Sequence, residues 1–83
     1  APGGVSEDDL IALLGLTRAE ARVAVAIAAG ATARAAARGL GLSFHTVRHQ
    51  IQSVIEKSGV GGKVELVAML ARLGGPSDAA PRG

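Results

Sequence analysis

The chain has 83 residues, of which 48% are hydrophobic, 1% aromatic and 19% charged, with no cysteine. This length allows one small domain, and the composition excludes a disordered chain, a disulfide scaffold and a thiolate metal site. The longest uncharged apolar stretch lies between Arg22 and Arg34, well short of the roughly 20 residues that a membrane span needs.

The formal net charge is only +2, but the basic residues are concentrated in the middle of the chain. Residues 18–63 contain seven Lys or Arg and two Glu, a local charge of +5, whereas residues 1–17 carry −3. The isoelectric point is near 10.0. This distribution favours an anionic partner, with an ordinary solvated surface as the alternative.

The N-terminal residues show neither the basic region nor the apolar region of a secretory signal peptide, so we expect a cytoplasmic protein. The chain begins at Ala1 without methionine, which indicates methionine removal or, as we favour, a fragment of a longer protein.

Helical signals recur along the chain, and no segment alternates as a strand does. Ser6 and Gly15 delimit a short leading helix within a leading segment or linker, residues 1–15. Thr17 and Glu20 form a capping box for a helix over about residues 18–29, which Gly30 ends. Thr32 caps a second helix that ends near residue 40. The sequence therefore predicts an all-α protein.

The third helix, over about residues 44–58 with Ser43 as its cap, is the most informative segment. One side is a core-facing stripe formed by Val47, Ile51, Val54, Ile55 and Ser58. The other side carries hydrogen-bonding side chains, namely His45, Arg48, His49, Gln52 and Glu56. A short helix, a glycine turn and a longer helix with a donor-rich face are typical of a helix-turn-helix.

The fourth helix, over residues 63–73, has two apolar stripes, so one can pack on the domain while the other contacts a partner. The first stripe is Val64, Val67, Ala68 and Ala71, and the second is Leu66, Met69, Leu70 and Leu73. We assign dimerisation to the second stripe, with packing against the leading helix as the alternative. Residues 74–83 are expected to form a disordered tail.

An ordered set of residues resembles the C-terminal DNA-binding domain of LuxR/FixJ-type bacterial transcription regulators. The set comprises Leu16-Thr17, Glu20, Val23, Gly30, Leu40-Gly41-Leu42-Ser43, Thr46-Val47-Arg48, Lys57, Gly59-Val60 and Glu65. The resemblance covers residues 16–73. It implies a four-helix helix-turn-helix domain, with a winged-helix-like three-helix DNA-binding core and a fourth helix that pairs subunits into a dimer.

The resemblance also implies roles for individual side chains. Base contacts are expected from Arg48, His49 and Gln52, with His45 beside them, and backbone contacts from Thr46, Arg34 and Lys63, with Ser43 at the helix N-terminus. The implied partners are double-stranded DNA with inverted half-sites, a second copy of the chain, and an N-terminal sensory or receiver domain that this chain lacks.

Other functions have less support in the sequence. His45 and His49 lack a third metal ligand at suitable spacing, so we expect no metal and no cofactor. Glu56 and His49 lack a nucleophile and a pocket, so we do not expect an enzyme. Phe44 is the one aromatic residue, which argues against single-stranded nucleic acid. The alternatives that remain are a promoter-reading region like that of a sigma factor and a helical protein-interaction module.

Overall fold

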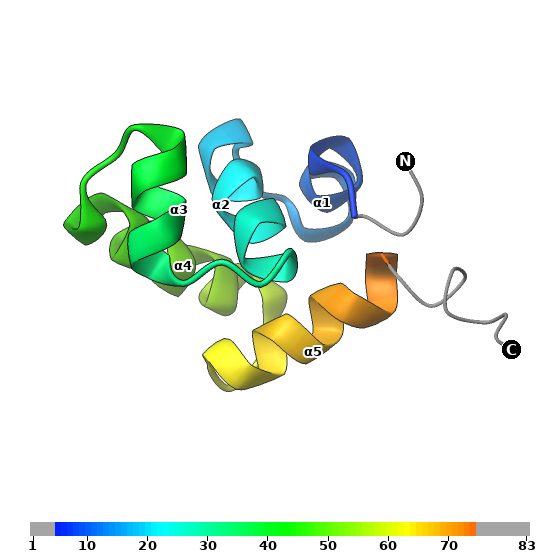
Figure 1. Cartoon of the computed structure of the whole chain (residues 1–83). Coiled ribbons are helices and arrows are strands. Elements are labelled where there is room, and N and C mark those ends of the chain that lie inside the picture. Colours follow the sequence, from blue (N-terminus) through cyan, green and yellow to red (C-terminus); the bar gives the residue numbers. More distant parts are fainter. Residues whose placement is uncertain (1–4, 75–83) are drawn as a thin grey trace, which may run out of the picture.

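The structure, a computed structural model, describes residues 5–74 and forms five α-helices in that range (Figure 1). They are α1 (Glu7–Leu14), α2 (Arg18–Ala28), α3 (Ala33–Leu40), α4 (Phe44–Ser58) and α5 (Lys63–Gly74). The predicted all-α fold is confirmed, and every helix begins and ends within one residue of its predicted bounds. The predicted tail, apart from Gly74, lies outside the described residues.

Hydroxyl side chains start four of the helices, as their sequence positions predict. Ser6, Thr17, Thr32 and Ser43 each accept a hydrogen bond from the backbone N–H three residues further on, at 3.0–3.1 Å. Each of these bonds satisfies a backbone donor that the first helical turn leaves free. The short α1 and α3 therefore have defined starts despite their modest length.

Helix α2 is central, because it contacts all four other helices. Its alanine-rich faces enter two apolar clusters. The first cluster contains Val5, Leu10, Leu16, Ala21, Ala24, Val54, Leu66 and Leu70. The second contains Val23, Ile27, Ala36, Ala37, Val47 and Ile51. Small side chains on α2 allow neighbouring helices to approach closely, but they bury little area each, so the core is thin.

The turn between α3 and α4 determines how the two helices of the helix-turn-helix meet. Gly41 has φ of +71°, a left-handed conformation that disfavours any residue with a Cβ atom. The Leu42 N–H donates to the Ala37 carbonyl at 2.9 Å, which closes the end of α3. Ser43 then caps α4 two residues after the glycine, so the connection is as short as a helix-turn-helix requires.

Glu20 connects the start of α2 to the end of α4. Its side chain is 11% exposed and accepts hydrogen bonds from Lys57 Nζ at 2.8 Å and from the Thr17 N–H at 2.9 Å. Burial raises the pKa of Glu20, but the hydrogen bonds from Lys57 and Thr17 and the charge of Lys57 outweigh it. The pKa of Glu20 consequently lies below its ordinary value.

Residues 5–74 include no helix with the length and apolar character needed to cross a membrane.

We expect Glu20→Gln to lower the free energy of unfolding at pH 7 by about 1–3 kcal/mol, because a charged hydrogen-bond acceptor is lost. The wild-type carboxylate has a lower pKa in the folded state than in the unfolded state, where it is about 4.5. Its contribution is therefore complete above pH 4.5 and is lost as pH falls through the folded pKa. Urea unfolding at pH 7 and at lower pH measures this difference.

The matched control is Glu56→Gln, which changes an exposed glutamate on α4 and should have little effect at either pH. A difference between Glu20→Gln and wild type that does not shrink on acidification would contradict the role assigned to this carboxylate.

Candidate nucleic-acid interface

The hydrogen-bonding side of α4 faces solvent. His45, Arg48, His49 and Gln52 are exposed, whereas the opposite side of the helix buries Val47, Ile51 and Val54. The four exposed residues lie at helical spacing, so they form one surface along the N-terminal half of α4. The structure thus brings together the four residues from which base contacts are predicted. Their donors and acceptors suit the edges of base pairs.

The N-terminus of α4 presents hydroxyl groups in a defined arrangement. The Ser43 hydroxyl donates to Thr46 Oγ1 at 2.8 Å and also accepts from the Thr46 N–H at 3.0 Å. Because Thr46 Oγ1 accepts a hydrogen bond from the Ser43 hydroxyl, the hydroxyl hydrogen of Thr46 is free to point elsewhere. Together with the positive end of the α4 dipole, this hydrogen suits an anionic oxygen.

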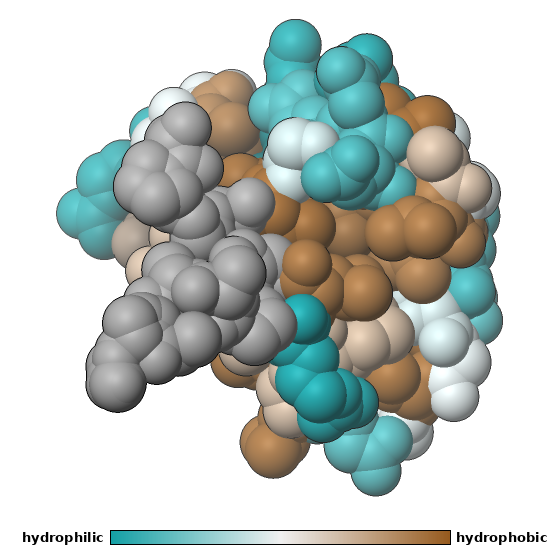
Figure 2. All heavy atoms as spheres, turned by 90° about the vertical axis from the view of Figure 1, so that its right-hand side faces the viewer, coloured by the Kyte–Doolittle hydropathy of each residue, from teal (hydrophilic) through white to brown (hydrophobic). Residues whose placement is uncertain are grey.

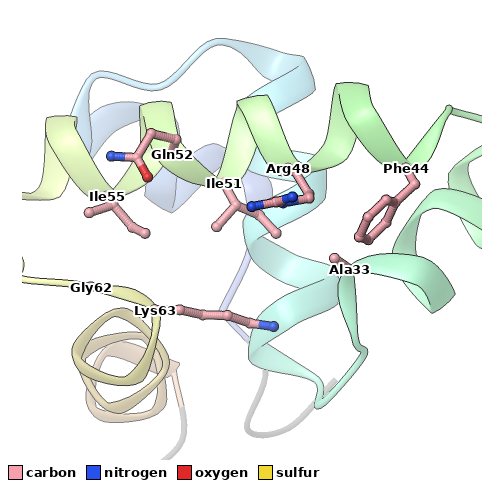
Figure 3. Close-up of a pocket in the computed structure, with 8 residues that line it drawn as sticks. All are labelled: Ala33, Phe44, Arg48, Ile51, Gln52, Ile55, Gly62 and Lys63. Atoms are coloured by element: carbon pink, nitrogen blue, oxygen red, sulfur yellow. The ribbon is translucent and has the colours of Figure 1, made fainter.

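A hollow of about 330 Å³ lies beside this surface, between α4 and the starts of α3 and α5 (Figure 3). Its lining residues are Ala33, Phe44, Arg48, Ile51, Gln52, Ile55, Gly62 and Lys63. Arg48 comes from the α4 wall, and Lys63 extends from the opposite wall at the beginning of α5. The hollow therefore has an apolar floor and two cationic side chains at its rim.

Two arginines lie near the single aromatic ring of the chain. The guanidinium carbon of Arg34 lies 4.2 Å from the centroid of the Phe44 ring, and that of Arg48 lies 5.8 Å from it. Both distances are within the range of a cation–π interaction. The ring thus brings Arg34 of α3 close to Arg48 of α4.

Ion pairs divide the basic residues into two groups. Arg18 pairs with Glu7 at 3.1 Å and Asp8 at 3.0 Å, and Lys57 pairs with Glu20. Within residues 5–74, by contrast, Arg34, Arg48 and Lys63 form no ion pair. Arg34, Arg48 and Lys63 are therefore among the cations that no carboxylate engages within the described residues, together with Arg22, Arg38 and Arg72.

The assignment of dimerisation to Leu66, Met69, Leu70 and Leu73 is corrected for two of these residues. Leu66 and Leu70 are each only 1% exposed and belong to the same cluster as Leu10 and Leu16. They stabilise the domain itself and cannot reach a partner without unfolding. Met69 is half-buried against that cluster, and only Leu73, 44% exposed, lies on the surface.

The other stripe of α5 is the one left uncovered. Val64 is 85% exposed, Val67 is 37% exposed, and Ala68 and Ala71 are exposed as well. The sequence correctly indicates that one stripe packs on the domain, and the structure buries Leu66 and Leu70 of the stripe to which dimerisation is assigned. The reason is that Val5 and the leading helix contribute to the cluster that covers Leu66 and Leu70. Dimerisation itself stays a prediction.

A second apolar area lies where α1 approaches the end of α5. Figure 2 shows hydrophobic surface on this side of the molecule, and Leu13 on α1 is 64% exposed.

In the described part of the chain, no three His, Cys, Asp or Glu side chains gather as metal ligands would.

A tight glycine turn between two helices, followed by a donor-rich helix flanked by unpaired cations, defines a helix-turn-helix domain of the DNA-binding kind. A family model described as bacterial regulatory proteins, luxR family (GerE), matches residues 14–70, more than half of the chain. The chain therefore belongs to the LuxR family and contains its DNA-binding regulatory domain. No curated protein and no solved structure matches the chain.

We expect Leu66→Ala to lower the free energy of unfolding by about 2–5 kcal/mol, because it leaves a cavity in the first apolar cluster. Val64→Ala removes methyl groups from an 85% exposed side chain. It should change the free energy of unfolding by less than about 0.5 kcal/mol. Chemical denaturation of both variants measures the two values. Equal losses would contradict the orientation of α5.

Proposed function

We propose that the domain binds double-stranded DNA sequence-specifically, with α4 in the major groove. The observation that carries this proposal is the exposed row of Arg48, His49 and Gln52 opposite the buried side of α4. Arginine can form two hydrogen bonds with guanine, glutamine can do the same with adenine, and histidine can donate to a base acceptor. His45, near the start of the helix, extends the same row.

Backbone contacts are proposed for the groups around this row. Thr46 and the α4 N-terminus donate to one phosphate, and Ser43 supports this contact by orienting the Thr46 hydroxyl. Arg34 on α3 and Lys63 on α5 provide charge on neighbouring elements, and neither is engaged by a carboxylate within the described residues. These contacts fix the position of α4 without distinguishing one sequence from another.

We further propose that two copies pair through α5 and bind inverted half-sites. The uncovered stripe of Val64, Val67, Ala68 and Ala71 supports this, because valines and alanines at this spacing allow two helices to pack closely. This stripe replaces the one that includes Leu66 and Leu70. A regulatory domain outside this chain is the proposed source of the signal, and the cytoplasm the proposed location.

We expect Arg48→Ala and Lys63→Ala to weaken DNA binding in different ways. Arg48→Ala should reduce the preference for the selected sequence over random DNA by about 1–3 kcal/mol. Lys63→Ala should weaken binding to both DNAs alike and reduce the slope of log affinity against log salt by about one. Fluorescence anisotropy with both duplexes at several salt concentrations measures these effects.

The matched control is Arg72→Ala, an exposed cation near the other end of α5, which should leave affinity and salt slope close to wild type. If Arg48→Ala and Lys63→Ala weaken specific and random binding equally, the division into base and backbone contacts is refuted.

We expect Val67→Glu to prevent dimer formation on DNA, because two glutamates would face each other across the α5 pair. The folded monomer should persist, since Val67 is already partly exposed. Leu73→Glu, on the other side of the helix, is the matched control. The mass of the protein–DNA complex, measured by light scattering, should drop from two copies to one for Val67→Glu only. Loss of the dimer in the Leu73 variant alone would assign dimerisation to the other side.

A further inference from the structure

Phe44 has a position that the proposed contacts do not account for. It is the first residue of α4, its side chain is half-buried, and it is the one aromatic residue in the chain. Its ring lies within cation–π range of Arg34 and Arg48, one from each helix of the helix-turn-helix. Arg34 is proposed to contact the DNA backbone and Arg48 a base, so one ring lies beside a residue of each kind.

The ring is half-buried, whereas the two arginines around it are exposed. The Ser43 cap fixes the first turn of α4, and the ring also lines the apolar hollow that extends to Ile51. Arg34 and Arg48 are exposed, with long side chains that lose rotamer freedom when they bind. A guanidinium held at a ring face has part of that freedom removed before DNA arrives, which lowers the ordering cost of binding.

The surroundings leave the ring as the partner of both arginines. Within residues 5–74, neither Arg34 nor Arg48 forms an ion pair or a side-chain hydrogen bond with a carboxylate. An ion pair would have to be broken before the guanidinium could contact DNA, whereas a ring contacts only its face and leaves the N–H donors at its edge free. An aromatic partner can therefore orient an arginine without occupying its donors.

We propose that Phe44 is a positioning residue for DNA recognition. Through its contacts with both guanidinium groups, the ring orients Arg48 toward base edges and Arg34 toward a phosphate. The proposal rests on the proposed DNA-binding function and adds a determinant of specificity that does not itself read a base. It also couples α3 to α4, so the backbone contact and the base contact are oriented together.

The first test compares Phe44→Leu with Phe44→Tyr, because leucine keeps an apolar side chain and tyrosine keeps the ring. We expect Phe44→Leu to lose about two- to fivefold in affinity for each guanidinium contact. The loss through Arg48 should appear as reduced discrimination between selected and random duplexes, and the loss through Arg34 as weaker binding to both. Phe44→Tyr should retain both the discrimination and the affinity of the wild type. The control is Leu42→Ala, a change in the adjacent turn that leaves the ring in place.

A double-mutant cycle tests whether Phe44 acts through Arg48. In an Arg48→Ala background, Phe44→Leu should cause no further loss of discrimination. Wild-type discrimination in Phe44→Leu, or an undiminished effect in the Arg48→Ala background, would overturn the proposal. A loss of discrimination in Phe44→Tyr as large as that in Phe44→Leu would overturn it too, because tyrosine keeps the ring face on which the proposal depends.

A measurement on the free chain separates this proposal from the proposed function. Ring-current shifts of the Arg34 and Arg48 side-chain protons, recorded by NMR, should be present in wild type and absent in Phe44→Leu. If these shifts are present while wild type fails to discriminate between duplexes, the proposed DNA-reading function fails although the ring contacts exist. If wild type discriminates but the shifts are absent, the positioning role of Phe44 fails and the function stands.

Discussion

The packing of α4 against α2 is the constraint on which the rest of the domain depends. Val47 and Ile51 enter one apolar cluster and Val54 the other, so the rotation of α4 about its axis is fixed along its whole length. Turning the helix to bury a different side would place histidine, arginine or glutamine in the core at a large desolvation cost. The same packing that stabilises a thin core therefore determines which side chains α4 exposes for the proposed contact with DNA.

Polar contacts at the helix ends add precision to this packing. The hydroxyl caps define where α2, α3 and α4 begin, and Glu20 joins the start of α2 to Lys57 near the end of α4. Because alanine contributes little buried area, such directional contacts carry a larger share of the specificity of the fold than they would in a leucine-rich core. The glycine turn at Gly41 then sets the angle at which α4 is presented.

Much of the fold follows from local signals in the sequence. Thr17 with Glu20, and Ser43 before Phe44, mark helix starts that depend only on nearby residues, and these predictions are confirmed. The donor row on α4 follows from helical periodicity in the same way. The orientation of α5 depends instead on which distant residues cover it, and local periodicity contains no information about the cluster that Val5 and Leu10 form with Leu66.

The contacts of Phe44 show the same distinction at the candidate site. Its pairing with Arg48 is visible in the sequence as a four-residue spacing on one helix. Its pairing with Arg34, at 4.2 Å, depends on the turn that brings α3 beside α4. The residues proposed to contact bases are thus predictable from one helix, whereas the contact between Phe44 and Arg34 requires the packed helix pair.

The most direct test of the account is selection of the chain on a randomised duplex DNA library at two salt concentrations, followed by sequencing and affinity measurement. The account predicts enrichment of an inverted repeat, with affinity falling as salt rises because bound phosphates release counterions. The absence of any enriched sequence, together with binding that does not respond to salt, would contradict DNA reading by α4 and indicate a protein-docking surface instead.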